Sequence, residues 1–244
     1  MYHTKISRHS GELSPGKSMA RGLRRRWFLA LILLSSLYSG LPFLAPVLME
    51  VGWSGPGKAI YLLYSFLCHQ LPQRSFFLFG PEPTYNLAEI VAAWQPDAVG
   101  QNPSHLFLLR GFIGNPDMGW KVAWSDRMVS MFTSLPVFGL LWWSLRHRLP
   151  RLPWWGLVLF LLPMAADGAT HFISDLGGIG QGFRDTNAWL AALTGRTFPA
   201  SFYLGDALGS FNSWMRLVTG LLFGLGAVWF AFPFLDNLLH TDNE

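Results

Sequence analysis

Apolar residues are concentrated in four long runs of the chain, and polar residues separate these runs. The first run, from Trp27 to Met49, contains no charged residue. A helix needs about 20 mostly apolar residues to cross the roughly 30 Å of hydrocarbon in a bilayer. The pattern therefore predicts an all-α integral membrane protein with four transmembrane helices. We place them at about 27–49, 122–145, 154–175 and 212–235.

A shorter apolar run lies in the first of the two long segments between these spans. It extends from Tyr61 to Cys68, and Gln70 and Pro72 follow directly. Because it is too short to cross a bilayer, we interpret it as an interfacial or re-entrant helix. Glycine and aromatic residues recur in both long segments, which indicates folded loops with short helices rather than disorder.

Composition supports a membrane protein and excludes several other classes. Only 13% of the residues are charged and 51% are hydrophobic, whereas about 25% are charged in a typical soluble domain. Cys68 is the single cysteine, which excludes an intramolecular disulfide and a thiolate-rich zinc site. The sequence contains no P-loop, dinucleotide fingerprint, Gly-x-Ser-x-Gly or His-Glu-x-x-His motif, so common enzyme signatures are missing.

Lysine and arginine residues predict the orientation in the membrane. Residues 1–26 contain seven of them, and the short link 146–151 contains three more. The much longer segments 50–121 and 176–211 contain only four and two. Since positive loops are retained in the cytoplasm, we expect a multi-pass protein of the cell (inner) membrane with both loops outside. The tails, 1–26 and 236–244, would then be cytoplasmic, and the basic tail would contact anionic lipid rather than nucleic acid.

Ionisable residues in the predicted spans all lie near the ends that adjoin the long loops. Such residues are costly in hydrocarbon and usually face a partner or a water-filled cavity. Asp167, His171 and Asp175 are spaced four apart, as are Asn212 and Arg216, so each set lies on one helix face. We expect them to converge, together with an Asp-Arg pair at the second span, in a charge-paired cavity on the extracytoplasmic side.

This reasoning selects candidate residues for ligand binding from the spans and both loops. They are Cys68, His69, Gln70, Arg74, Asp126, Arg127, Asp167, His171, Asp175, Arg184, Asp185, Asn187, Asn212 and Arg216. Arginine side chains bind phosphate groups well, and a nearby Asp or His can serve as a general base. The sequence therefore suggests binding or processing of an anionic lipid-linked or other amphiphilic ligand; whether the protein is an enzyme stays open.

Two other interpretations remain open at this point. The charges can form a purely structural network, in which Asp167 and Asp175 neutralise Arg127 and Arg216. The protein can also be a non-catalytic structural or assembly subunit of a membrane protein complex, since folded aromatic loops suit docking.

A divalent metal is a further candidate cofactor. His and Asp side chains four residues apart can chelate a metal from one helix face. The candidate ligands are His69, Asp167, His171 and Asp175. The competing interpretation is that His171 hydrogen-bonds a neighbouring carboxylate.

The segment Cys68-His69-Gln70-Leu71-Pro72-Gln73-Arg74-Ser75 resembles the signature Cys-His-Gln-x-Pro-x-Arg-Ser. This signature is found in a family of uncharacterised bacterial and archaeal polytopic membrane proteins, known only as a domain of unknown function. The resemblance extends roughly from Tyr61 to the end of the last span and implies no activity. Many relatives open the second span with Cys-x-x-Cys, whereas this chain has 124–128 as Trp-Ser-Asp-Arg-Met, which argues against a dithiol or metal role there.

Overall fold

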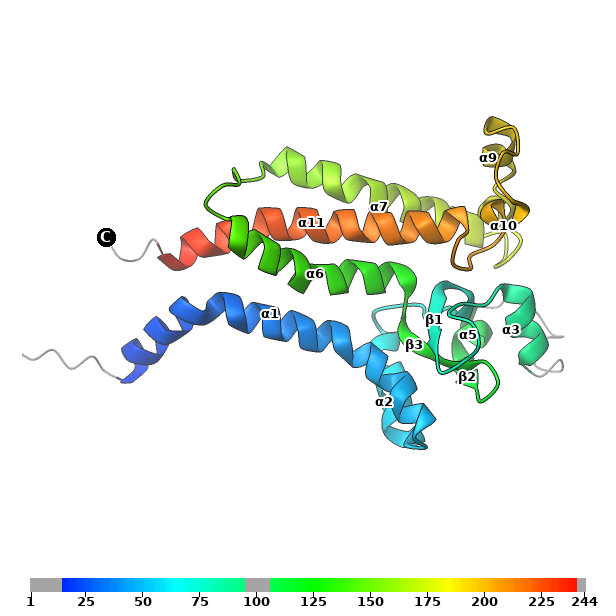
Figure 1. Ribbon diagram of the computed structural model, residues 1–244, viewed down its shortest axis with the longest axis horizontal. Coiled ribbons are helices and arrows are strands. Elements are labelled where there is room, and N and C mark those ends of the chain that lie inside the picture. The colour runs from blue at the N-terminus through cyan, green and yellow to red at the C-terminus, as the bar shows by residue number, and fades with distance from the viewer. Residues whose placement is uncertain (1–14, 95–105, 241–244) are drawn as a thin grey trace, which may run out of the picture.

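The computed structural model describes residues 15–94 and 106–240, with side chains described for 26–94 and 108–238 (Figure 1). Four of its helices are long and apolar enough to cross a membrane. They are α1 (Pro15–Glu50), α6 (Asp126–Leu145), α7 (Trp154–Asp175) and α11 (Phe211–His240). The first and last helices extend into the predicted tails, because residues 15–26 continue α1 and residues 236–240 continue α11.

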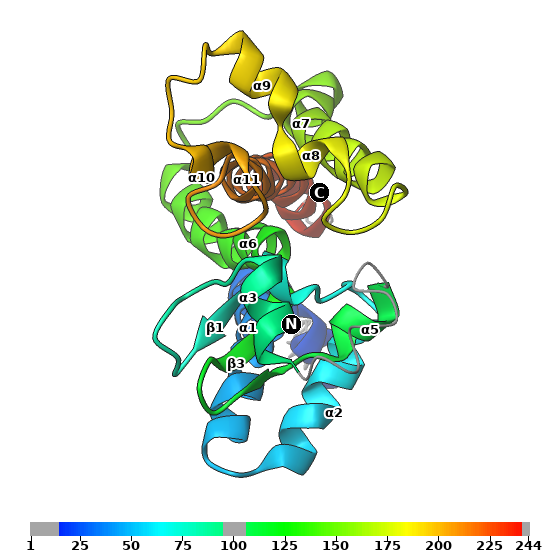
Figure 2. The same ribbon diagram turned by 90° about the vertical axis from the view of Figure 1, so that its right-hand side faces the viewer.

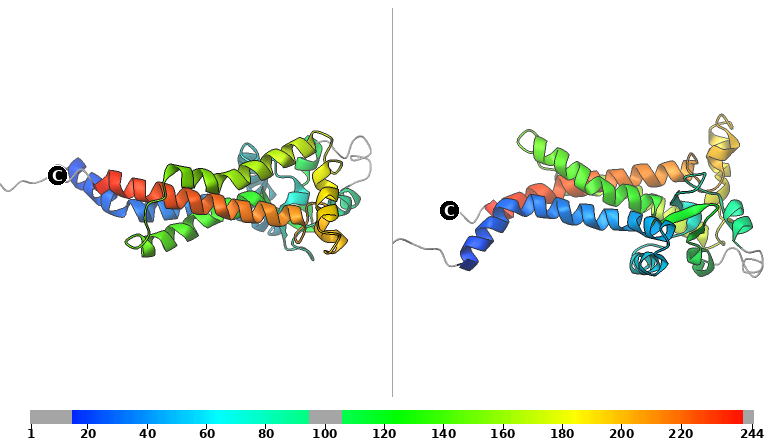
Figure 3. Two further views of the ribbon diagram at one scale, coloured as in Figure 1. Left: turned by 90° about the horizontal axis from the view of Figure 1, so that it is seen from above. Right: turned by 60° about the horizontal axis from the view of Figure 1, so that its bottom comes forward.

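The helix α11 packs against both α6 and α7, and α1 packs on the other side of α6 (Figures 1 and 3). At one end of this bundle lie the start of α1, the end of α11 and the link between α6 and α7. An aromatic cluster including Trp27, Phe28, Trp142 and Phe232 joins α1, α6 and α11 near this end. Large apolar side chains such as Leu33 and Leu159 are exposed on the outside of the bundle, as is suitable for contact with lipid.

The α6–α11 contact depends on small residues. A Cβ atom added to Gly220 would lie 2.0 Å from Ser130 Oγ and 2.9 Å from the carbonyl oxygen of Arg127. One turn later, a Cβ on Gly224 would lie 1.9 Å from Ser134 Oγ. Facing glycine and serine residues four apart therefore let the two backbones approach closely, as in many membrane helix pairs.

The two long loops lie together at the opposite end of the bundle (Figure 2). The first loop lies next to α1 and α6, and the second next to α7 and α11. The first contains α2 (Ser54–Ser65), the 3₁₀ turn η1 (Pro72–Arg74), β1 (Ser75–Leu78), α3 (Leu87–Ala93), α5 (Leu106–Gly111), β2 (Gly114–Asn115) and β3 (Gly119–Ser125). The second contains α8 (Phe183–Thr186), α9 (Ala188–Leu193) and α10 (Ala200–Tyr203). The short apolar helix of the first loop, α2, begins and ends earlier than the run that predicted it.

The boundary predicted for the second span is wrong at its start. Residues 119–125 form β3, the central strand of an antiparallel sheet in the order β1-β3-β2. Val122, Ala123 and Trp124 are fully buried in this strand and pack in a cluster with α1 and α2 residues. Their hydrophobicity thus reflects burial in protein rather than in lipid, and the membrane helix begins only at Asp126.

Candidate functional site

The charged residues of α6, α7 and α11 form ion pairs with one another and with loop residues at the loop end of the bundle. Asp167 of α7 accepts from two arginines, Arg127 Nη2 of α6 and Arg184 Nη2 of the second loop, each at 2.7 Å. One of the contacts allowed by the structural interpretation, that of Asp167 with Arg127, is thus present. The four-residue spacing of the polar side chains in α7 explains the geometry. It places Asp167, His171 and Asp175 along one face of the helix, and this face points toward the arginines.

Arg216 of α11 binds neither of the two aspartates, Asp167 and Asp175, that the structural interpretation offered as its partners. Its Nε lies 2.7 Å from Asp126 Oδ1, and its Nη1 lies 2.6 Å from Asp206 Oδ1. Asp175 binds neither Arg216 nor Arg127 but Arg74, with Nη1 and Nη2 at 2.7 and 2.8 Å. Arg74 Nε also reaches Asp206 at 2.7 Å. The arginine of the first loop thereby connects to α7 and to the segment before α11.

Within the described residues, these ion pairs join four arginines to four aspartates. Asp206 is buried, which raises the pKa of its carboxyl, but Arg74 and Arg216 outweigh this effect and the pKa is lowered overall. Burial lowers the pKa of Arg74, yet Asp206 and Asp175 raise it above its usual value. Buried charges are tolerated when partners and hydrogen bonds compensate their lost hydration, as they do here.

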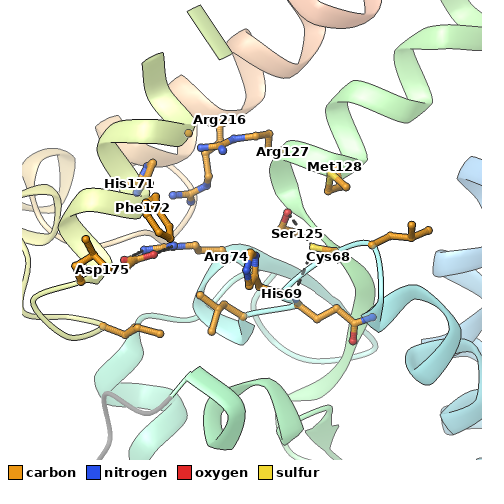
Figure 4. Close-up of a pocket in the computed structure, with 16 residues that line it drawn as sticks. Cys68, His69, Arg74, Ser125, Arg127, Met128, His171, Phe172, Asp175 and Arg216 are labelled. Carbon is orange, nitrogen blue, oxygen red and sulfur yellow. Dashed lines mark hydrogen bonds and ion pairs between the residues drawn. The ribbon is translucent and has the colours of Figure 1, made fainter. Parts of the chain in front are cut away.

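A pocket of about 380 Å³ lies beside this network, between the first loop, the start of α6 and the end of α7 (Figure 4). Its lining includes Leu67, Cys68, His69, Gln70, Leu71, Arg74, Ser125, Arg127, Met128, Gly168, His171, Phe172, Asp175, Leu176, Ile179 and Arg216. Figure 4 shows Arg74, Arg127 and His171 on one part of the wall and Cys68 with Ser125 on another. The pocket thus combines an arginine-rich part with apolar side chains.

The Cys68–Leu71 wall is held in place by the small sheet. Gln70 adopts a left-handed conformation, with φ of 51°, and its side chain donates to the carbonyl oxygen of Tyr61 at 2.9 Å. Lys121 of β3, which is fully buried, donates from Nζ to the carbonyl oxygens of Gln70 at 2.7 Å and Arg110 at 2.9 Å. Cys68 Sγ lies 3.5 Å from Ser125 Oγ, so the thiol is held against the end of β3.

Lys121 predicts a pH-dependent contribution to stability. Burial, with a smaller contribution from Arg110 and despite an opposing one from Cys68, lowers the pKa of its ammonium group to about 7 from an ordinary value of 10.5. Between these values the unfolded chain binds the proton and the folded chain does not, so this contribution increases as the pH rises from 7 toward 10.5. The slope is limited to about 1.4 kcal/mol per pH unit for one proton.

We therefore expect wild type to gain stability relative to Lys121→Met as the pH is raised from 7 to 9.5. Unfolding of both proteins in the same detergent, followed by tryptophan fluorescence at several pH values, measures the difference. If the difference in stability between wild type and Lys121→Met stays constant from pH 7 to 9.5, Lys121 is not a buried lysine that is mainly neutral in the folded protein.

Several predicted site residues lie outside the pocket lining. Asp126 and Asp167 lie behind it as partners of the arginines. Asp185 accepts from the backbone N–H of Gly182 at 2.8 Å and thereby caps the N-terminus of α8. The other three residues lie in the second loop and at the start of α11: Arg184, Asn187 and Asn212. Asn187 and Asn212 both donate to the carbonyl oxygen of Arg184 at 2.7 Å, which ties the second loop to α11.

The predicted metal ligands do not assemble. Among the described residues, no group of three or more His, Cys, Asp or Glu side chains is placed to hold a metal ion. The physical reason is that arginines occupy the carboxylates: Arg127 and Arg184 bind Asp167, and Arg74 binds Asp175. His171 Nε2 lies 3.9 Å from Asp167 Oδ1, too far for the hydrogen bond that the alternative interpretation requires.

Asp206 is the network residue that the sequence reasoning missed as a site residue. It lies in a loop without a motif, and its backbone carbonyl as well as its carboxylate binds Arg216. One signal was available: four candidate arginines, Arg74, Arg127, Arg184 and Arg216, faced only three acidic residues in the predicted spans. A further acid near the arginines would have been a reasonable expectation, since buried charges need partners.

Known proteins show similarity to most of the chain. Residues 101–230 match the family described as "Predicted membrane protein (DUF2085)". An uncharacterized protein of Methanocaldococcus jannaschii is 25% identical over 226 residues, which cover 89% of this chain and 97% of the relative. No solved structure matches. The family match does not include the Cys68–Ser75 signature, which therefore stays a prediction. Since the match spans more than half of a chain with four apolar helices, this protein belongs to the DUF2085 family of predicted membrane proteins.

Proposed function

We propose that this membrane protein binds an anionic amphiphile, such as a lipid or a lipid-linked compound, in the pocket beside the arginine network. We further place the loops and the pocket on the extracytoplasmic side of the cell membrane, since the basic residues 146–151 lie at the opposite end of the bundle and positive segments remain inside.

The observation that carries the proposal is the position of Arg127. Its side chain is 21% exposed and lines the pocket next to Met128 and across from Phe172. Among the described residues, Arg127 has one ion pair, with Asp167, whereas Arg74 and Arg216 each bind two carboxylates. A partly exposed arginine beside an apolar wall suits a ligand with an anionic head and an apolar chain.

The surroundings of Asp167 make Arg127 a suitable residue for a test. Arg184 also binds Asp167 at 2.7 Å, so Arg127→Gln leaves that carboxylate paired. We expect the variant to fold and to bind dodecyl phosphate at least about 10-fold more weakly than wild type, because hydrogen bonds to charged groups contribute about 1.5–3 kcal/mol. Calorimetry or native mass spectrometry of the purified protein measures the affinity.

Arg148→Gln is the matched control, since Arg148 is exposed at the other end of the bundle. Dodecyltrimethylammonium, which has the same chain length and a cationic head, is the control ligand. Equal affinity for both amphiphiles, or unchanged dodecyl phosphate binding by Arg127→Gln, would refute the proposal and favour a purely structural salt-bridge network.

A further inference from the structure

Two buried nitrogen atoms of pocket residues have no hydrogen-bond partner in the described part of the chain. They are Nε of Arg127 and Nδ1 of His171. Both residues line the same pocket, one from α6 and the other from α7. A buried polar atom without a partner is unfavourable, and a ligand bound in this pocket would offer a partner to both atoms.

The hydrogen bond at the other ring nitrogen of His171 decides what kind of partner Nδ1 needs. Nε2 lies 3.1 Å from Arg184 Nη2. A guanidinium can only donate, so Nε2 must accept and cannot carry a proton. The remaining proton of the neutral imidazole is therefore on Nδ1, which makes Nδ1 a donor. The arginine Nε–H is also a donor, and both atoms thus require an acceptor.

We propose that His171 is a neutral hydrogen-bond donor to the headgroup of the bound amphiphile, and that His171 Nδ1 and Arg127 Nε together select a headgroup with oxyanion oxygens. This inference rests on the proposed function and assigns a chemical class to its ligand. It also gives His171 a positioning and selecting role instead of that of a general base, because Nδ1 already carries its proton and Nε2 accepts from Arg184.

The charge balance agrees with a neutral donor at this position. Asp167 already has two arginine partners, and a protonated His171 would place another cation next to Arg184. A neutral ring adds a donor without adding charge, and Arg184 fixes both its tautomer and its orientation, as partners of histidine commonly do.

Two replacements of His171 separate its two nitrogen atoms. The amide of glutamine reaches the position of Nε2, so His171→Gln can still accept from Arg184 but lacks the donor at Nδ1. The amide of asparagine reaches the position of Nδ1, so His171→Asn keeps a donor there and loses the contact with Arg184. We expect His171→Gln to bind dodecyl phosphate about 10-fold more weakly than wild type, and His171→Asn to bind it within about 3-fold of wild type.

Histidine ¹⁵N NMR of the purified protein gives a readout that does not depend on a ligand. The inference requires the resonances of a neutral His171 with its proton on Nδ1 near pH 7, and a change at Nδ1 when dodecyl phosphate is added. A proton on Nε2, a charged ring, or equal affinity of His171→Gln and wild type would overturn it while leaving the proposed function intact. If wild type fails to bind dodecyl phosphate at all, the proposed function itself is refuted.

Discussion

Replacing Asp206 with asparagine should abolish most of the folded protein. The substitution preserves the shape of the side chain and removes the negative charge that Arg74 and Arg216 share at 2.7 and 2.6 Å. Asp206 is 5% exposed and Arg216 is 2% exposed, so water cannot replace the lost partner. Breaking a buried ion pair on one side typically costs about 3–5 kcal/mol, which is a large fraction of the stability of an ordinary domain.

The measurement is the yield of monodisperse protein in size-exclusion chromatography, together with thermal unfolding in detergent. Asp117→Asn is the control, since Asp117 is exposed in the first loop and should lose less than about 0.5 kcal/mol. A stability of Asp206→Asn equal to that of the control would show that the network does not depend on this carboxylate. Loss of folding in both variants would instead indicate a general sensitivity of the first and second loops.

Replacing Gly220 with valine should separate α6 from α11. The first added carbon would lie 2.9 Å from a backbone oxygen, that of Arg127, and 2.0 Å from Ser130 Oγ. The serine hydroxyl can rotate away, but the backbone contact requires the two helices to move apart. Overpacking of this kind costs about 1–3 kcal/mol. Since Arg127 lies at the contact, we also expect weaker binding of dodecyl phosphate.

Gly40→Val provides the matched control in another apolar helix. A Cβ on Gly40 meets nothing within 4 Å among the described residues, so valine there adds apolar surface without a clash. Thermal unfolding of both variants in the same detergent measures the difference. If Gly220→Val is as stable as Gly40→Val, the close approach of α6 and α11 is not required for the fold.

The positions of charged residues in the sequence predicted which end of the bundle they occupy but not all of their partners. Asp126 and Arg127 are adjacent in sequence, yet Asp126 binds Arg216 of α11 and Arg127 binds Asp167 of α7. Neighbouring residues on a helix point about 100° apart, so an adjacent pair must address different helices. Which helices these are depends on the packing of α6, and that is a property of the whole bundle.

Residues 119–125 show a second limit of prediction from one sequence. Val122, Ala123 and Trp124 are apolar and lie just before the apolar run 128–145, from which Ser125 and the charged pair Asp126-Arg127 separate them. An apolar side chain avoids water, and it can do so equally well in a buried strand or on a lipid-facing helix. Only the pairing with both β1 and β2 and the contact with α1 and α2 identify the segment as the centre of a sheet.

The sequence by itself determined that this is a membrane protein with four apolar helices and that its costly charges lie together at one end of them. The first property follows from the length of the apolar runs, and the second from the high cost of placing a charge in hydrocarbon. Each can be read from one segment of the sequence without knowing how the segments pack. The tertiary structure alone decided that Asp206 completes the network, that Lys121 supports the pocket wall and that His171 and Arg127 line the same pocket. Such relations join residues far apart in the chain, and they arise only when the helices and loops pack.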